Sequence, residues 1–207
     1  MKFDSTASAS LRDIMRWRRD VRHFRPEPIP DDVVERLEQS MVYAPSVGNS
    51  RPWRVFRVES EGLRRQVRAI FEACNDEAAK GYDSERTQLY RQLKLAGLDQ
   101  APLQLAVFTD CDPVEGHSLG RRTLPATLEQ STAMAIHTLW LTARAENVGL
   151  GMLSILDAER MEAIFEVPES WRFSSYLCLG WPCFEDDTPL LDRAGWQENT
   201  ALGWTRR

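Results

Sequence analysis

The chain has 207 residues, of which 43% are hydrophobic and 28% are charged, and its formal net charge is -5. This length and composition suffice to bury a core without disulfides or metals, so we expect one globular domain over residues 1–207 rather than a disordered chain. The acidic balance argues against a nucleic-acid partner, and no stretch approaches the roughly 18 apolar residues that a membrane span requires.

The first predicted helix follows Ser10, which with Asp13 three residues later resembles a capping box. Apolar residues then recur at helical spacing, and a basic cluster falls near the end of the helix. On a helix, Arg18 and Arg22 would share one face because they are four residues apart. Three prolines between residues 26 and 30 then break the helical pattern.

A second helix is predicted to run to Met41, with Asp31 or Asp32 as its N-terminal cap. A loop over residues 44–52 follows it. Residues 53–59 alternate apolar with charged side chains, which predicts a half-exposed strand.

Helical periodicity returns over residues 63–79, whereas residues 80–97 are more polar and carry a glycine near each end. We expect this polar segment to form a lid. The apolar run 105–109 predicts a buried strand, and the longest helix is predicted over residues 127–146, on the apolar spacing of Ala133, Ile136, Leu139, Trp140 and Ala143.

The last third of the chain is predicted to hold a strand over residues 152–156, a short helix over 158–165 and a strand over 175–180. Helices dominate, with four or five strands, and strands and helices do not alternate strictly. This order favours an α+β fold over a doubly wound α/β fold.

The basic cluster is the first candidate site. Five arginines lie between Arg16 and Arg25, with Asp20 as the single carboxylate among them. Guanidinium groups bind phosphate bidentately and stay charged at physiological pH, so a phosphate-bearing small molecule is the expected partner. The alternative is a solvated basic face that surface carboxylates neutralise.

The loop of residues 44–50 is the second candidate site. A proline fixes its entry, a glycine permits close approach of the backbone, and small hydroxyl and amide side chains can hydrogen-bond a polar heterocycle or a polyol. The alternative is an ordinary turn between a helix and a strand.

These two elements and a later Gly-Leu-Gly-Met-Leu-Ser stretch resemble the FMN-dependent nitroreductase superfamily. The 5,6-dimethylbenzimidazole synthase branch of that superfamily is similar in several motifs that stand in the same order between Arg16 and Trp196. They are residues 18–25, 44–48, 93–95, 120–125, 154–157 and 176–180.

The resemblance implies a nitroreductase-like fold, with a mostly antiparallel sheet of four to five strands flanked by helices, in an intertwined homodimer. It also implies that reduced FMN is the substrate and is fragmented with O2 to 5,6-dimethylbenzimidazole, the lower ligand of vitamin B12, and a sugar phosphate. A separate flavin reductase is then an expected partner.

By the same resemblance, the residues expected to hold FMN are Arg18, Arg19, Asp20, Val21, Arg22 and Ser154, together with Ser46 and Gly48 from the partner subunit and Leu95 from the lid. Asp20 and Ser154 match the two polar residues near the reacting part of the flavin. A carboxylate beside arginines stays ionised and can act as a base, and a hydroxyl can both donate and accept a hydrogen bond. The alternatives are an ion-pair partner that orients the arginines and a satisfied core hydroxyl.

Two other functions stay open on the sequence. One is an NAD(P)H-dependent nitroreductase or flavin reductase that retains FMN, which Asn49 favours because asparagine is the more nitroreductase-like residue there. The other is a flavin-binding protein without catalysis. Arg51 stands where glutamine is usual in the superfamily and adds positive charge.

The four cysteines are scattered without C-x-x-C spacing, and no pair of histidines stands near them. We therefore predict neither a metal site nor a disulfide framework. Reduced thiols and an N-terminus without the apolar run of a signal peptide predict a cytoplasmic protein.

Overall fold

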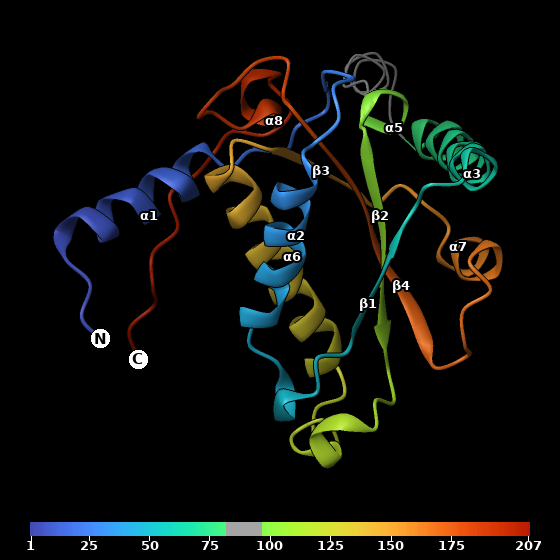
Figure 1. Cartoon of the computed structure of the whole chain (residues 1–207), viewed down its shortest axis with the longest axis horizontal. Helices are drawn as coiled ribbons and strands as arrows, with labels where there is room; N and C mark the ends of the chain where they lie inside the picture. Colours follow the sequence, from blue (N-terminus) through green and yellow to red (C-terminus); the bar gives the residue numbers. More distant parts are fainter. Residues whose placement is uncertain (82–96) are drawn as a thin grey trace.

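A computed structural model describes residues 1–81 and 97–207 (Figure 1). The strands are β1 (Trp53–Arg57), β2 (Leu103–Asp110), β3 (Gly149–Leu153) and β4 (Trp171–Gly180). The α-helices are α1 (Ser5–Trp17), α2 (Asp31–Ser40), α3 (Glu61–Ala79), α5 (Gly97–Gln100), α6 (Thr127–Ala145), α7 (Ala158–Ile164) and α8 (Leu190–Arg193). Three short 3₁₀ helices are η1 (Met41–Tyr43), η2 (Val47–Asn49) and η3 (Glu115–Ser118).

The four strands form one antiparallel sheet in the order β1-β2-β4-β3. The fold is therefore α+β with an antiparallel sheet, which confirms the predicted class. The two central strands, β2 and β4, are the longest; β2 is almost wholly buried, and β4 is buried over its second half. Their alternating side chains serve two separate cores because a strand points successive residues to opposite faces.

One core lies between the sheet and the helices α2 and α6, and the other lies between the sheet and α3 and α7. In β2, for example, Val107 packs in the first core and Phe108 in the second, and both are fully buried. Figure 1 shows α2 and α6 side by side along the sheet, with α3 and α7 on its other side. The helices predicted over residues 63–79, 127–146 and 158–165 are confirmed, although Ala133 lies outside the buried face of α6.

The prediction for the first helix is wrong in both its start and its reach. Helix α1 begins at Ser5, capped by the Asp4 side chain, which accepts a 2.9 Å hydrogen bond from the Ala7 amide, so Ser10 lies inside the helix. The helix ends at Trp17, and Arg18 is its C-cap with an extended backbone (φ -72°, ψ 106°). The arginines after it therefore follow an extended chain and share no helical face.

Helix α2 begins where it was predicted, but neither aspartate is its cap. The N-cap is Pro30, whose carbonyl accepts the amides of Val33 and Val34. Asp31 and Asp32 occupy the first turn, where negative charge is favourable next to the positive end of the helix dipole.

The strand predicted over residues 152–156 is shifted, because β3 covers Gly149–Leu153. Gly149 and Gly151, which precede the predicted strand, are strand residues, and a crossing segment explains why glycine stands at both positions. A Cβ atom on Gly151 would lie 2.2 Å from the Val21 carbonyl oxygen, and one on Gly149 would lie 2.9 Å from the Val21 side chain. Only glycine lets the chain pass so closely over this strand. Ser154 consequently lies just beyond the strand.

The crossing segment covers the outer edge of β3. Asp20 forms a parallel bridge with Leu150, and the Val21 amide donates to the Leu150 carbonyl over 3.0 Å. A second bridge joins Phe24 to Pro182 beyond the end of β4. The sheet therefore holds the segment after α1 in an extended form, with its charged residues beside the strand ends.

The predicted lid of residues 80–97 falls mainly on residues 82–96, which lie outside the described residues, and so does Leu95. None of the helices in residues 1–81 and 97–207 combines the length and the apolar character of a transmembrane segment.

Candidate functional site

A cavity of about 370 Å³ lies beside the segment that covers β3. Its walls come from three parts of the chain that are distant in sequence: Trp17 at the end of α1 with residues 19–23 after it, Arg144 near the end of α6, and residues between 182 and 194 around α8. Figure 1 shows the stretch after α1 and the C-terminal turns around α8 at the same end of the sheet. The fold thus brings the predicted arginine cluster to a concave site.

The arginines of the cluster have different surroundings. Arg19 and Arg22 line the cavity, as does Val21. Arg18 instead lies with its guanidinium 4.7 Å from the ring centre of Trp140 in α6. Burial lowers the pKa of Arg18 from its usual value, and the neighbouring positive charge of Arg19 lowers it further.

Asp20 is held at both carboxylate oxygens. One oxygen accepts a 3.0 Å hydrogen bond from Nε of Arg22, and the other accepts a 3.0 Å hydrogen bond from the Met152 amide in β3. The side chain is 33% exposed and lines the cavity. Asp20 therefore pairs with an arginine, fixes the segment to the sheet and still faces the space where a ligand would lie.

The positive charge of the cavity is only partly compensated. Arg19 donates from its terminal nitrogen to the carbonyl of Arg16, but its Nε is buried without a hydrogen-bond partner in the described part of the chain. A buried donor without an acceptor is costly, so an anion that reached Arg19 Nε would relieve that cost. The donor set of the cavity therefore fits a phosphate group.

Two further arginines line the cavity, and the sequence analysis did not identify them. Arg144 pairs with Glu185 over 2.8 Å, and Arg193 pairs with Asp186. The acidic run of residues 185–187 is the sequence feature that could have indicated basic partners. Those partners could not be named from the sequence, because two of them, Arg16 and Arg144, lie far from the run along the chain.

The acidic run also fixes the C-terminal segment to α1. Asp187 accepts a 2.8 Å hydrogen bond from Arg16, which holds the pKa of that carboxyl below its usual value.

The second predicted element, the loop of residues 44–50, lies elsewhere. Its η2 turn places Gly48 at φ 57°, so close to η3 that a Cβ atom there would lie 2.9 Å from the Gly116 carbonyl oxygen. The Val47 amide donates to Oγ of Ser131 in α6, and Oγ of Ser46 accepts from the Arg51 amide. Both a left-handed turn and a close approach therefore require the glycine.

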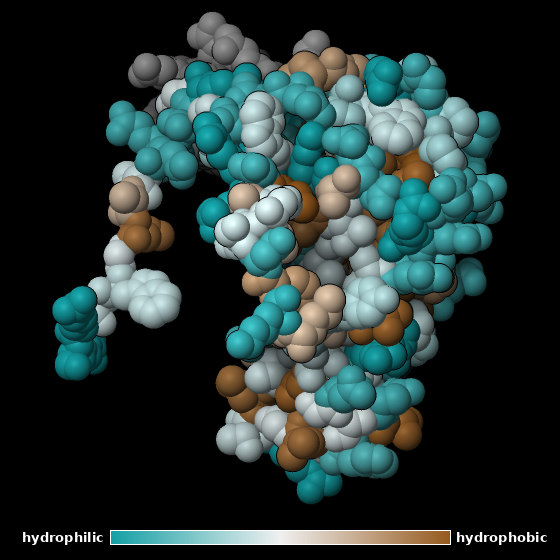
Figure 2. All heavy atoms as spheres, turned by 60° about the vertical axis from the view of Figure 1, so that its left-hand side comes forward, coloured by the Kyte–Doolittle hydropathy of each residue, from teal (hydrophilic) through white to brown (hydrophobic). Residues whose placement is uncertain are grey.

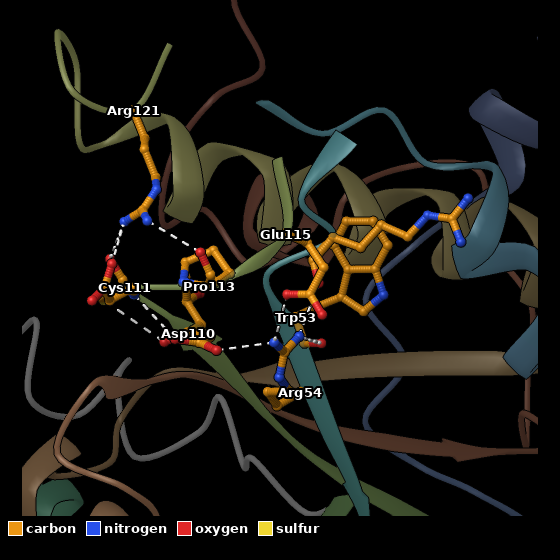
Figure 3. Close-up of polar contacts among 10 residues, drawn as sticks. Trp53, Arg54, Asp110, Cys111, Pro113, Glu115 and Arg121 are labelled. Carbon is orange, nitrogen blue, oxygen red and sulfur yellow. Dashed lines mark hydrogen bonds and ion pairs between the residues drawn. The ribbon is translucent and has the colours of Figure 1, made fainter. Parts of the chain in front are cut away.

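The loop after β2, which carries η3, is fixed by two arginines (Figure 3). Arg121 donates to the carboxylate of Asp112 over 2.7 Å and to the Pro113 carbonyl over 3.1 Å, and Arg54 in β1 donates to Asp110 over 2.9 Å. Because η3 packs against Gly48, these contacts also determine the position of the predicted flavin loop.

One chain does not bring the two predicted elements together. The loop contacts α6 at Ser131, and the arginine segment contacts α6 at Trp140, where the indole Nε1 donates to the Arg19 carbonyl over 3.4 Å. Nine residues of helix separate the two contacts, or about 13 Å along the axis.

Ser154 lies two residues after Met152, so it stands near the strand end that Asp20 contacts, and it is exposed. The cavity of one chain thus collects Arg19, Asp20, Val21 and Arg22. It does not include Ser46, Gly48 or Ser154.

Comparison with known proteins identifies the family and several relatives of the chain. The model of the nitroreductase family matches residues 15–181. The protein named 5,6-dimethylbenzimidazole synthase from Rhodobacter capsulatus is 58% identical over 207 residues, which are 100% of both chains. The protein of the same name from Rhodospirillum rubrum is 48% identical over 99% of this chain and 97% of its own. An oxidised iodotyrosine deiodinase bound to FMN and 3-iodo-L-tyrosine has a similar fold, with a TM-score of 0.73, 21% identity and coverage of 95% of this chain and 97% of that one.

Proposed function

The chain belongs to the nitroreductase family and, within it, to the 5,6-dimethylbenzimidazole synthases, and we propose that it fragments reduced FMN with O2 to 5,6-dimethylbenzimidazole and a sugar phosphate. It is an FMN-dependent oxidoreductase of cobalamin biosynthesis. A separate flavin reductase in the same cytoplasm supplies the reduced flavin.

The observation that carries this proposal is the position of Asp20. Its carboxylate lies between Arg22 and the Met152 amide, in a cavity that four arginines line, together with two further carboxylates, Glu185 and Asp186, that are each paired with an arginine. Asp20 orients Arg22 and fixes the segment to the sheet, and it also keeps a carboxylate beside the space where the ligand would lie. A carboxylate fixed there suits a group that accepts a proton from the bound molecule.

The phosphate of FMN is expected to be held by Arg19 and Arg22, which line the cavity, and by Arg18, which precedes them in the chain. Arg19 Nε supports this assignment because it is buried without an acceptor. Val21, beside Asp20, gives the cavity an apolar contact for the flavin.

Bound reduced FMN supplies the electrons that O2 takes up and the ring carbons that remain in the product. The residues of the chain hold and orient it. Asp20 accepts a proton near the ribityl carbon, and its bond to the Met152 amide fixes the direction of its oxygens. Ser154, just beyond the same end of β3, directs a hydrogen bond toward the flavin.

The proposal predicts a specific product. Full-length protein incubated in air with chemically reduced FMN is expected to yield 5,6-dimethylbenzimidazole, measured by mass spectrometry, with loss of an equal amount of flavin. The same mixture without O2 is expected to leave the FMN intact. Recovery of all the FMN in air, with rapid oxidation of NADPH by a nitroaromatic acceptor, would instead establish the retained-cofactor alternative.

We also propose that the active form is a homodimer and that Ser46 and Gly48 reach the flavin from the partner subunit. The separation of the loop and the arginine cavity along α6 supports this arrangement. So does α1, which has no buried residue and exposes Leu11, Met15 and Trp17.

Figure 2 shows brown apolar side chains at the lower end of the molecule. In Figure 1 this end holds residues 41–49, which include η1 and η2, and the loop after β2, which carries η3. Exposed apolar residues there are Val42, Tyr43, Val114, Leu119 and Leu124. Apolar surface gathered around the flavin loop suits an interface with a second copy.

Subunit mixing tests the shared site. A chain with Arg22→Met and a chain with Gly48→Val are each expected to be inactive, because each lacks one half of every site. Co-expressed chains are expected to recover about a quarter of the wild-type product formation, because half of the dimers are mixed and each mixed dimer has one intact site. Absence of recovery in mixed dimers that sedimentation shows to have formed would exclude the shared site.

A further inference from the structure

Trp140 supports two consecutive residues of the arginine cluster. Its ring lies 4.7 Å from the Arg18 guanidinium, and its Nε1 donates to the Arg19 carbonyl over 3.4 Å. We propose that Trp140 is a positioning residue that holds Arg18 ready for the phosphate and thereby makes the site select phosphorylated over unphosphorylated flavin. This inference rests on the proposed function, because it assigns the cluster to the FMN phosphate.

The environment of Arg18 indicates that it is held for a ligand. Among residues 1–81 and 97–207, the structure gives its guanidinium no hydrogen bond and no ion pair, although it is half-buried beside Arg19. The nearby carboxylate of Asp20 is bonded to Arg22 and to the Met152 amide instead. Burial of a charge without a partner is unfavourable, so an aromatic ring and a later anion are the groups that can stabilise it.

Stacking suits such a role because of the geometry of the guanidinium. Its N–H donors point outward in the plane of the group, and an aromatic ring offers none of the acceptor atoms that a phosphate offers them. The Trp140 ring, over which the guanidinium carbon lies, therefore restrains Arg18 without using the donors that grip a phosphate. An exposed arginine would have to lose its side-chain entropy when the ligand binds, and a stacked one has already lost much of it.

The position of Trp140 in α6 agrees with this role. The fully buried positions of the helix around it are Ile136, Leu139 and Ala143, which face the sheet. Trp140 is only half-buried and flanks that core, on the side where the chain after α1 passes. The indole thus occupies the contact between α6 and the arginine segment.

The test compares the affinities for oxidised FMN and riboflavin, measured by fluorescence titration of the full-length protein. Wild type is expected to bind FMN more tightly than riboflavin. Trp140→Leu is expected to lower the affinity for FMN by about 5- to 30-fold and that for riboflavin by less than about 2-fold, since a partly desolvated cation–π contact is worth that range. Trp140→Phe keeps a ring face and is expected to recover most of the preference for FMN.

Trp171→Leu is the matched control, because Trp171 is also half-buried and lies under an arginine, with Arg54 5.6 Å from its ring centre. It is expected to leave the ratio of the two affinities unchanged. In an Arg18→Met background, Trp140→Leu is expected to change the FMN affinity by less than about 2-fold, because two residues that act through one contact are not additive.

The inference is overturned if Trp140→Leu weakens both flavins equally, if it leaves the ratio at the wild-type value, or if its full effect persists without Arg18. Circular dichroism and a thermal melt of Trp140→Phe and Trp140→Leu show that the folded protein is compared. Flavin binding is measured without turnover, so the two ideas can fail separately. If wild type forms product but Trp140→Leu leaves the ratio of FMN to riboflavin affinity unchanged, only this inference is refuted. If Trp140→Leu changes that ratio but wild type forms no product, only the proposed reaction is refuted.

Discussion

Replacement of Asp20 by asparagine is expected to lower the rate of 5,6-dimethylbenzimidazole formation by about 10²- to 10⁴-fold, the usual contribution of a general base. Asparagine has nearly the same shape and keeps one oxygen, which can still accept the Met152 amide. Its amide cannot take up a proton from the bound flavin. The rate is measured as product formed per active site after mixing with reduced FMN and O2.

Measuring the affinity of Asp20→Asn for FMN shows whether the variant has lost only its proton acceptor or has also lost flavin binding. Asp20→Asn is expected to keep FMN affinity within several-fold of wild type, because the variant removes a negative charge from beside the arginines. Asp32→Asn is the matched control, since Asp32 also pairs with an arginine, Arg36, but on α2, outside the cavity. An unchanged rate in Asp20→Asn would remove Asp20 from the reaction and leave it as an ion-pair partner that orients Arg22.

Replacement of Gly151 by alanine is expected to detach the arginine segment from the sheet. The new Cβ atom would lie 2.2 Å from the Val21 carbonyl oxygen and 3.3 Å from the Val21 carbonyl carbon, both of them backbone atoms that cannot rotate away. We expect the free energy of unfolding to fall by about 3 kcal/mol or more, above the usual cost of overpacking. Urea denaturation measures that change, and FMN titration is expected to show a loss of affinity in whatever protein remains folded.

Gly62 provides the comparison. It lies in α3, where a Cβ atom would be 3.5 Å from the Ser60 side chain, an ordinary contact. Gly62→Ala is expected to keep or raise the stability by up to about 1 kcal/mol, because alanine is the better helix former. Equal stability of Gly151→Ala and wild type would show that the crossing segment is not held against β3 as described.

The fold could be predicted from the sequence where one side-chain pattern determined an element. The long amphipathic helices α3 and α6 and the buried strand β2 were found in this way. Predictions failed at the ends of elements, where a contact from a distant part of the chain decides. Gly149 and Gly151 stand before the strand predicted at residues 152–156, but they belong to β3, where glycine is required because Val21 crosses the strand.

The candidate site, too, could be predicted from the sequence only in part. A cluster of arginines around Asp20 is visible in the sequence, because charge is a property of the residues themselves. Its geometry depends on partners that no local pattern indicates: the Met152 amide, the ring of Trp140, and Arg193, which lines the same cavity. Residue type therefore predicts the ligand chemistry, whereas tertiary contacts decide which donors can reach a ligand.

The bridge between Asp20 and β3 affects the order in which parts of the protein fold during its synthesis on the ribosome. The two groups that it joins, the Asp20 carboxylate and the Met152 amide, are 132 residues apart in the chain. The arginines are synthesised early, but they have no strand to lie against until β3 has emerged, and β3 in turn pairs with β4. Contacts of such separation form slowly, so we expect the arginine segment to reach its place beside β3 late in folding. A nascent chain that stalls before β3 carries the arginines but no site.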